Sequence, residues 1–340
     1  MNVKQNKVRA FFKNPLSQII LFVVILSVIQ LLAMAKLIPS SFVYAIGNTL
    51  IYAIIAIGFC LLLGYSGLAS LGTAGFIGLG AYSAFYVVQQ FGLPYIVALI
   101  VTLVVSIVIG VVVGFISLRI EGIYLAILTL GLAEIIRNLL MVIKSTIKID
   151  IDSVKLFGMQ MGARGGYFLI LVTFAVLMWF TANLINSPTG RAMLAMKNST
   201  SAAQAMGISL MKYRLLAFVI STVFAAVGGL LYMMFVRTMT TATSTLLTLT
   251  TSLNILGAVI IGGSKSLWGT TFGVFIIYGI QSMFLSKIDF FQKNPAFITM
   301  ITGVLIILVV MFFPGGFAQI AVQVKAWCKK KFGKAQKEVA

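Results

Sequence analysis

The chain has 340 residues, a length that would ordinarily suggest two or three soluble domains. Its composition excludes that class, because 61% of the residues are hydrophobic and only 9% are charged, against about 25% in a typical soluble domain. The net charge of +19 would indicate a nucleic-acid partner in a soluble protein. Here the basic residues form small clusters between long uncharged stretches, as in the cytoplasmic loops of membrane proteins. We therefore expect a protein surrounded by lipid, with no nucleic-acid partner.

The inventory of reactive side chains is small. The absence of histidine excludes histidine-based triads and histidine metal sites, and the two cysteines, Cys60 and Cys328, cannot build a cysteine-rich metal site. No G-x-x-x-x-G-K-[ST] phosphate loop occurs; the nearest fragment, at 333–335, lacks the upstream glycine and the hydroxyl. We expect a chain without catalytic residues, metal or cofactor of its own, which does not hydrolyse ATP.

The hydropathy pattern predicts an all-α polytopic membrane protein with about ten transmembrane helices, some broken or re-entrant, and short loops. A helix needs about 20 apolar residues to cross the hydrocarbon core. Breakers at 39–41, 64–67 and 92–94 divide the longest uncharged stretch into three spans. One segment of the glycine-rich pair at 247–263 and 268–286 is a candidate re-entrant segment. The predicted spans are 14–35, 42–63, 68–90, 95–118, 122–143, 165–190, 215–236, 247–263, 268–286 and 294–324.

The distribution of basic residues predicts the orientation. With ten spans and both termini cytoplasmic, 16 of the 25 lysines and arginines lie in inner segments, in agreement with the positive-inside rule. The predicted division is a basic cytoplasmic N-terminus at 1–15, a transmembrane domain at 16–315 and a basic cytoplasmic tail at 316–340. Within the domain, the loop 188–214 is predicted to be cytoplasmic and the loop 144–166 external.

The first hydrophobic segment has two interpretations. Basic residues, an apolar run and the sequence Ala33-Met34-Ala35 resemble a signal peptide with its cleavage site. The apolar run is longer than the usual core of a signal peptide, which is about 7–15 residues, so we favour a retained membrane anchor.

Two glycine- and serine-rich segments, 64–82 and 262–273, interrupt the hydrophobic pattern in a similar way. Small residues permit close helix packing, and a break in a helix is tolerated where protein or water satisfies the freed backbone groups. Tight packing and a broken helix that lines a pathway are both open and compatible. Paired interruptions in a transporter point to its translocation pathway. The candidate pathway residues are Gly64, Ser66, Gly67, Ser70, Gly72, Thr73, Gly262, Gly263 and Ser266.

The predicted span 122–143 carries two charges. Glu134 and Arg137 are three residues apart and therefore share a helix face, where pairing reduces the cost of roughly 3 kcal/mol or more for an unpaired charge in the membrane. We favour a structural intramembrane ion pair; the alternative is that Glu134 carries a proton or substrate.

The loop 188–214 is predicted to form two short helices at the cytoplasmic face. Pro188 ends the preceding helix, 191–196 forms the first short helix, and Ala202-Ala203 begins a second that Gly207 stops. Such an element could insert into a groove of another protein or be an ordinary solvated loop helix.

At this loop the sequence resembles the LivM-type permease subunit of branched-chain amino-acid ABC importers. The resemblance is carried by GRAMLAMK at 190–197 and AAQAMGI at 202–208, and by three further motifs in the same order. It covers roughly residues 45–315. The further motifs are GYSGLASLG at 64–72, GIY at 122–124 with TLGLAEIIR at 129–137, and GGSKSLWG at 262–269.

The resemblance implies a permease in the inner membrane of a bacterium, paired with a homologous second permease, two cytoplasmic ATPase subunits that bind ATP and Mg²⁺, and an extracytoplasmic substrate-binding protein. It also implies that Ser66, Ser70, Thr73 and Ser83 make only weak contacts along the pathway, because tight binding slows release. The residues it implies for coupling to the ATPase are Gly190, Arg191, Ala192, Ala202, Ala203 and Gly207.

Several positions differ from the family pattern. In the coupling loop, the family often has acidic residues at the positions of Asn198, Ser199 and Thr200. In the first glycine-rich segment, a histidine is common at the position of Thr73. The external loop lacks, at 148–152, the glycine-rich turn of many members. The substrate therefore remains open among branched-chain amino acids, urea, short amides and sugars. The competing functions are an ion-coupled secondary transporter that uses Glu134 and a membrane-embedded enzyme or scaffold, both disfavoured by the few titratable groups.

Overall fold

The computed structural model describes residues 15–35, 39–120, 122–150, 155–156, 159–160, 163–241, 244–283, 288, 295–312, 315–317 and 319. Three predicted features lie wholly or partly outside these residues: most of the N-terminal segment 1–15, most of the basic tail 316–340 with Cys328, and part of the loop 144–166. The helices are α2 (Pro15–Met34), α3 (Ser40–Cys60), α4 (Thr73–Phe85), α5 (Tyr95–Ser117), α6 (Ile123–Ile143), α7 (Ala163–Asn186), α8 (Pro188–Asn198), α9 (Thr200–Ala205), α10 (Leu210–Val236), α11 (Leu249–Gly262), α12 (Leu267–Val274), α13 (Ile280–Met283) and α15 (Pro295–Phe312).

The fold class is confirmed as an all-α multi-pass membrane protein. Six of the described helices are long and apolar enough to cross a membrane, and 249–262 and 297–309 form shorter apolar helices. Several helices continue through π-helical turns: 61–66 extends α3, 86–90 extends α4, and 275–279 joins α12 to α13. With these extensions, every predicted span overlaps a helical segment among the described residues.

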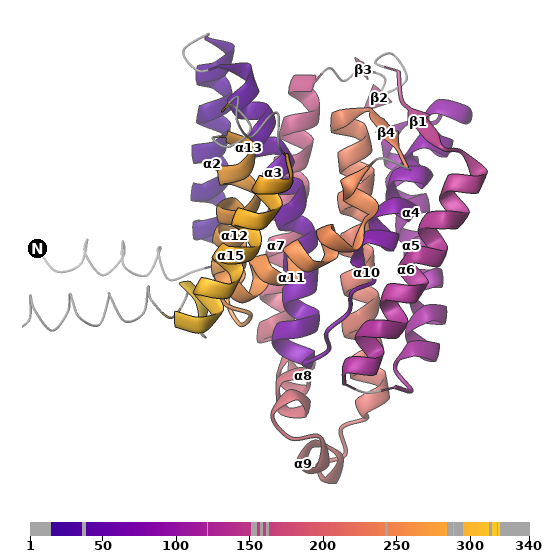
Figure 1. Ribbon diagram of the computed structural model, residues 1–340, viewed down its shortest axis with the longest axis vertical. Coiled ribbons are helices and arrows are strands. Elements are labelled where there is room, and N and C mark those ends of the chain that lie inside the picture. Colours follow the sequence, from indigo (N-terminus) through magenta and orange to yellow (C-terminus); the bar gives the residue numbers. More distant parts are fainter. Residues whose placement is uncertain are drawn as a thin grey trace, which may run out of the picture.

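Two of the predicted spans contain helices that are too short to cross a membrane by themselves. The third predicted span was placed at 68–90, but the chain is non-helical at 67–72 and α4 begins only at Thr73. The 14 residues of α11 extend about 21 Å, which is shorter than the hydrocarbon core of about 30 Å. In Figure 1, α11 lies crosswise within the bundle rather than along it. The interruption at 67–72 is a broken helix of the kind that was predicted, and α11 is the shorter member of the pair in which a re-entrant segment was predicted.

The two loops of interest lie at opposite ends of the molecule. Figure 1 shows α8 and α9 at one end and the strand β1 (Thr146–Lys148) at the other. β1 pairs in antiparallel register with β4 (Thr238–Thr240), and β2 (Lys155–Leu156) pairs with β3 (Met159–Gln160). The sequence interpretation did not include these strands. The pair β1–β4 connects the loop after α6 with the segment after α10, and so joins two parts of the chain that are about 90 residues apart.

The helices α3 and α10 form the centre of the bundle. The membrane-crossing window of α3 is 89% buried, whereas the corresponding window of α6 is 17% buried. Close contacts with α4 help to bury α10. A Cβ added to Gly80 of α4 would lie 1.8 Å from the Ala226 carbonyl oxygen of α10, and one added to Gly229 of α10 would lie 1.9 Å from the Ile77 carbonyl oxygen of α4. Since no side chain fits there, the glycines let two helix backbones touch. The core therefore depends on backbone approach as well as on apolar side chains.

Candidate functional site

The non-helical segment between α3 and α4 is stabilised by polar groups from other helices. Gly67, with φ +75°, ends the π-helical turn after α3, a conformation that favours glycine. The Leu71 amide donates to Thr129 Oγ1 of α6 at 3.0 Å, and the Ala74 amide donates to Ser252 Oγ of α11 at 3.1 Å. These two hydroxyl groups take the place of the carbonyl oxygens that would accept from the amides in an unbroken helix. A break within a membrane requires such replacement, because no water is present in the hydrocarbon core.

Three glycines, in α4 and the segment just before it, pack on α6 at intervals of three residues. A Cβ added to Gly72 would lie 3.0 Å from the Thr129 carbonyl oxygen, and one added to Gly75 would lie 2.9 Å from Ala133 Cα. A Cβ added to the third, Gly78, would lie 2.8 Å from Leu140 Cδ1. The segment 64–82 was interpreted either as a tight helix contact or as a broken helix. Both features are present, since the helix is broken at 67–72 and the chain is closely packed from Gly72 onward. Whether it lines a pathway stays a prediction.

The two glycine- and serine-rich turns meet at the end of the bundle that carries α8. Tyr65 Oη donates to the Lys265 carbonyl oxygen at 3.0 Å, and Cys60 Sγ donates to that of Ser264 at 3.2 Å. A Cβ on Gly64 would lie 1.7 Å from the Ser264 carbonyl oxygen. Sequence reasoning noted the similarity of the turns but missed their contact and the roles of Cys60 and Tyr65.

Lys197 of α8 connects the helical loop to this junction. Its ammonium group donates to the carbonyl oxygens of Leu63 at 3.1 Å and Gly64 at 2.8 Å, which lie in the last turn before the break. Partial burial lowers the pKa of Lys197, and the nearby Lys265 lowers it further. The lysine was part of a recognised motif, but no signal in the sequence identified its partners about 130 residues earlier.

Local capping residues build the elbow between α7 and α8. Ser187 Oγ donates to the Leu184 carbonyl oxygen at 2.6 Å and accepts from the Gly190 amide at 3.4 Å, and Pro188 begins α8. Ser199 caps α9 in the same way, by accepting from the Ala202 amide at 3.3 Å. The predicted short helices at 191–196 and from 202 are thus present, with slightly wider bounds.

The six predicted coupling residues do not form one exposed surface. Gly190 is buried, and a Cβ there would lie 2.3 Å from the Ile185 carbonyl oxygen; Ala203 is 3% exposed. A charged residue at Gly190 would disturb the elbow, and one at Ala203 would disturb the packing of α9, so neither tests docking. Arg191, Ala202 and Gly207 are exposed and Ala192 is half-buried. Sequence reasoning missed Met206, which is 83% exposed at the end of α9.

The predicted pathway hydroxyls are enclosed. Ser66, Ser70 and Thr73 are all buried, and Ser66 Oγ donates to the Leu62 carbonyl oxygen. Ser70 and Thr73 line a void of about 10 Å³ between α4 and α10, which is about the space of one water molecule. Ser83 contacts Thr102 Oγ1 at 2.5 Å instead. The remaining candidate pathway residues lie in and beside the second glycine- and serine-rich turn; they are Gly262, Gly263 and Ser266. Ser266 caps α12, because its Oγ accepts from the Gly269 amide at 3.1 Å.

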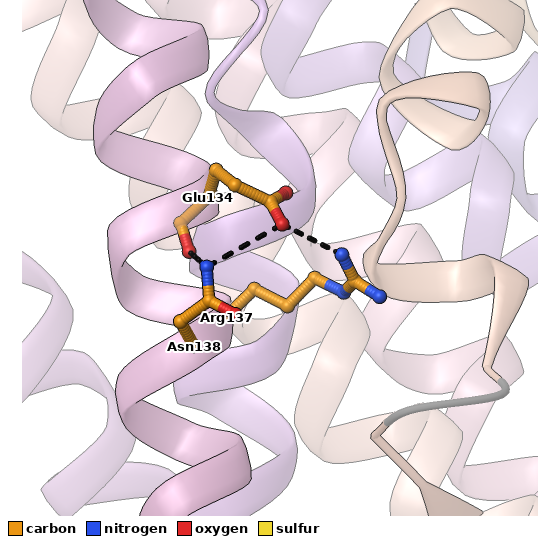
Figure 2. A network of polar contacts seen from close by, with 3 residues as sticks. All are labelled: Glu134, Arg137 and Asn138. Atoms are coloured by element: carbon orange, nitrogen blue, oxygen red, sulfur yellow. Dashed lines mark hydrogen bonds and ion pairs between the residues drawn. The ribbon is translucent and has the colours of Figure 1, made fainter.

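The predicted ion pair is present near the middle of α6. Arg137 Nη1 lies 2.7 Å from Glu134 Oε1, and Asn138 Nδ2 donates to the Glu134 carbonyl oxygen at 2.9 Å. Figure 2 shows the three side chains and their contacts. All three side chains belong to one helix. The Glu134 side chain is 53% exposed and that of Arg137 is 22% exposed. This arrangement fits a self-satisfied pair on the outer face of α6.

We expect the two charges to stabilise one another. Glu134→Gln or Arg137→Gln alone should lower the thermal stability of the solubilised protein more than the double variant does, because each single change leaves an unpaired charge. Size-exclusion recovery after graded heating measures this effect. Loss of transport in Glu134→Gln with unchanged stability would contradict the structural role.

Comparison with known proteins adds independent information. Residues 41–310 match the family model described as branched-chain amino acid transport system / permease component. The chain is 30% identical over 216 residues to the high-affinity branched-chain amino acid transport system permease protein LivM of Escherichia coli (strain K12), and equally to that of Salmonella typhimurium; the match covers 54% of this chain and 50% of each relative. It is 26% identical over 195 residues to the probable ABC transporter permease protein YphD of Escherichia coli (strain K12), covering 54% of this chain and 55% of that protein. The chain thus spans about half the length of the curated relatives it matches. No solved structure matches it significantly.

Proposed function

The chain belongs to the family of branched-chain amino acid transport system permease components, and on that premise we propose that it forms the membrane pathway of an ATP-binding-cassette importer for amino acids, branched-chain amino acids in particular. Its partners would be a homologous second permease, two cytoplasmic ATPase subunits that bind ATP and Mg²⁺, and an extracytoplasmic binding protein that delivers the substrate. It would lie in a bacterial inner membrane with both termini in the cytoplasm.

The contact of Lys197 carries the proposal. An importer driven by separate ATPase subunits needs an element that receives their motion and transmits it to the pathway. The helices α8 and α9 extend from one end of the bundle (Figure 1), and Lys197 bonds directly to the turn that precedes the helix break at 67–72. Movement of α8 would therefore reach the broken crossing through two hydrogen bonds.

The exposed surface of α9 suggests the chemistry of the ATPase contact. Residues 188–214 contain arginine and lysine but no carboxylate. Met206 is 83% exposed, with exposed Ala202 and Gly207 nearby in the sequence. An apolar hollow with acidic residues around its rim would complement this surface, with Met206 as its central contact.

Replacing Met206 by aspartate should weaken ATPase association about tenfold or more, because burying a methionine side chain contributes about 1.5–3 kcal/mol. Ser209→Asp, which adds the same charge at another exposed position, is the matched control. Co-purification of the ATPase subunits at graded salt concentrations measures the change. Equal retention by both variants would exclude Met206 as a contact.

The outer face of α6 is proposed to contact the second permease. A carboxylate that is half-exposed in the middle of a membrane helix is costly against lipid, and such groups usually face protein or water. A second permease that covers Glu134 and Asn138 would remove this exposure.

Uptake into sealed vesicles that contain the assembled complex tests the proposed function. Import of leucine should persist after the ion gradients are collapsed and stop when ATP is depleted. The opposite pattern would favour an ion-coupled transporter.

A further inference from the structure

The end of α4 that is remote from the helix break at 67–72 is joined to the two-stranded sheet β1–β4. Tyr82 of α4 is buried, and its hydroxyl donates to the Lys144 carbonyl oxygen. Because that bond uses the phenolic proton, the hydroxyl accepts from Thr241 Oγ1, which is also buried. Lys144 precedes β1 and Thr241 follows β4. One phenol therefore contacts the chain on both sides of the sheet.

Gln89, in the extension 86–90 of α4, makes a second connection. Its Nε2 donates to Asp150 Oδ2 at 2.8 Å, and its Oε1 accepts from the Asp150 amide at 3.0 Å. Asp150 also pairs with Lys148 of β1 at 3.5 Å, and the side chains of Asp150 and Lys148 are 56% and 69% exposed. An exposed segment after β1 is thus one side-chain contact away from α4.

The sheet is attached to α4 differently from its other neighbours. β1 follows α6 and β4 follows α10 along the chain, and the Ile149 amide donates to the Arg237 carbonyl oxygen at 2.8 Å. The attachment to α4 is made by side chains, with the Lys144 ammonium group 4.4 Å from the centre of the Phe85 ring in addition to the bonds of Tyr82 and Gln89. A displacement of the sheet would therefore reach α4 through contacts that single substitutions can remove.

We infer that Tyr82 and Gln89 are positioning residues that transmit the docking of the substrate-loaded binding protein to α4. The inference rests on the proposed function, in which the loop 144–166 is external. The binding protein would contact the exposed Lys148 and Asp150, and the shift of the sheet would pass through Gln89 and Tyr82 to the broken crossing. Such a link is a coupling between two sites, so its removal should reduce the response to docking and leave the ATPase subunits themselves unchanged.

ATP hydrolysis by the reconstituted complex, with and without the leucine-loaded binding protein, tests this role. Tyr82→Phe should lower the stimulated rate about fivefold or more, the factor that corresponds to one hydrogen bond, while the basal rate stays at the wild-type value. Because Tyr82 is 3% exposed, the loss cannot come from a missing contact with the binding protein. Tyr86→Phe, which removes a phenolic hydroxyl from the next turn of the same segment, is the matched control and should be stimulated normally.

An exchange of polarity between Gln89 and Asp150 separates transmission from a general packing defect. Gln89→Glu places a second carboxylate against Asp150 and should reduce the stimulation. Gln89→Glu combined with Asp150→Asn restores a carboxylate–carboxamide pair in the opposite order, so it should recover most of the stimulation. Gln90→Glu adds the same charge at the exposed neighbouring position and should have little effect.

Three results would contradict the inference. Full stimulation of both Tyr82→Phe and Gln89→Glu would show that docking does not act through these side chains. An equal fall of the basal and stimulated rates, without recovery in the double variant, would mean that the two residues only hold the fold. In both cases the proposed function would stand if the wild-type complex imports leucine with ATP. A wild-type complex that no loaded binding protein stimulates would overturn the inference together with the proposed partner.

Discussion

Replacing Lys197 by methionine should abolish most ATP-driven uptake while the protein still folds and inserts. The change keeps the length and apolar stem of the side chain but removes both hydrogen bonds to the carbonyl oxygens of Leu63 and Gly64. Hydrogen bonds to charged groups contribute about 1.5–3 kcal/mol each, and the partial exposure of Lys197 places these near the lower value. Loss of even one such bond corresponds to a change of about tenfold or more in coupling.

The measurement compares leucine uptake with ATP hydrolysis in reconstituted complexes. ATP hydrolysis should continue in Lys197→Met without matching import, because the proposed ATPase contact on α9 is unchanged. Lys212→Met, which removes an exposed lysine at the start of α10, should behave as the wild-type protein. Wild-type uptake in Lys197→Met would show that motion does not pass through this contact.

The second large effect is expected at the contact between α4 and α10. Gly80→Ala places a Cβ 1.8 Å from the Ala226 carbonyl oxygen, an overlap that no side-chain rotation relieves. Overpacking typically costs about 1–3 kcal/mol, and we expect the upper end or more, because two helix backbones must separate. The folded fraction recovered after solubilisation and heating should fall sharply.

Gly131→Ala is the appropriate control for this variant. Gly131 lies on α6, and a Cβ there meets no atom within 4 Å among the described residues. Alanine also has the higher helix propensity, so this variant should be as stable as the wild-type protein or slightly more stable. Equal stability of Gly80→Ala and Gly131→Ala would contradict the close approach of α4 and α10.

Several features of the site were predictable because their causes are local. The break at Gly67, the elbow after Pro188 and the caps at Ser187 and Ser199 all follow from residues within a few positions of one another. The Glu134–Arg137 pair was predicted for the same reason, since spacing on one helix places both side chains on one face. The coupling residues stay a prediction, and the motif that contains Gly190 and Ala203 did not reveal that these two members are buried.

By itself, the sequence determined that this protein lies in a membrane, where its helices fall and which family it belongs to, because hydrophobicity, turn preference and motifs are properties of short stretches. Only the tertiary structure decided that Lys197 reaches Gly64, that the turns at 64 and 264 meet, and that β1 pairs with β4. These contacts join residues about 90 to 200 positions apart. They depend on how glycine-lined helix backbones approach one another, which no single segment encodes.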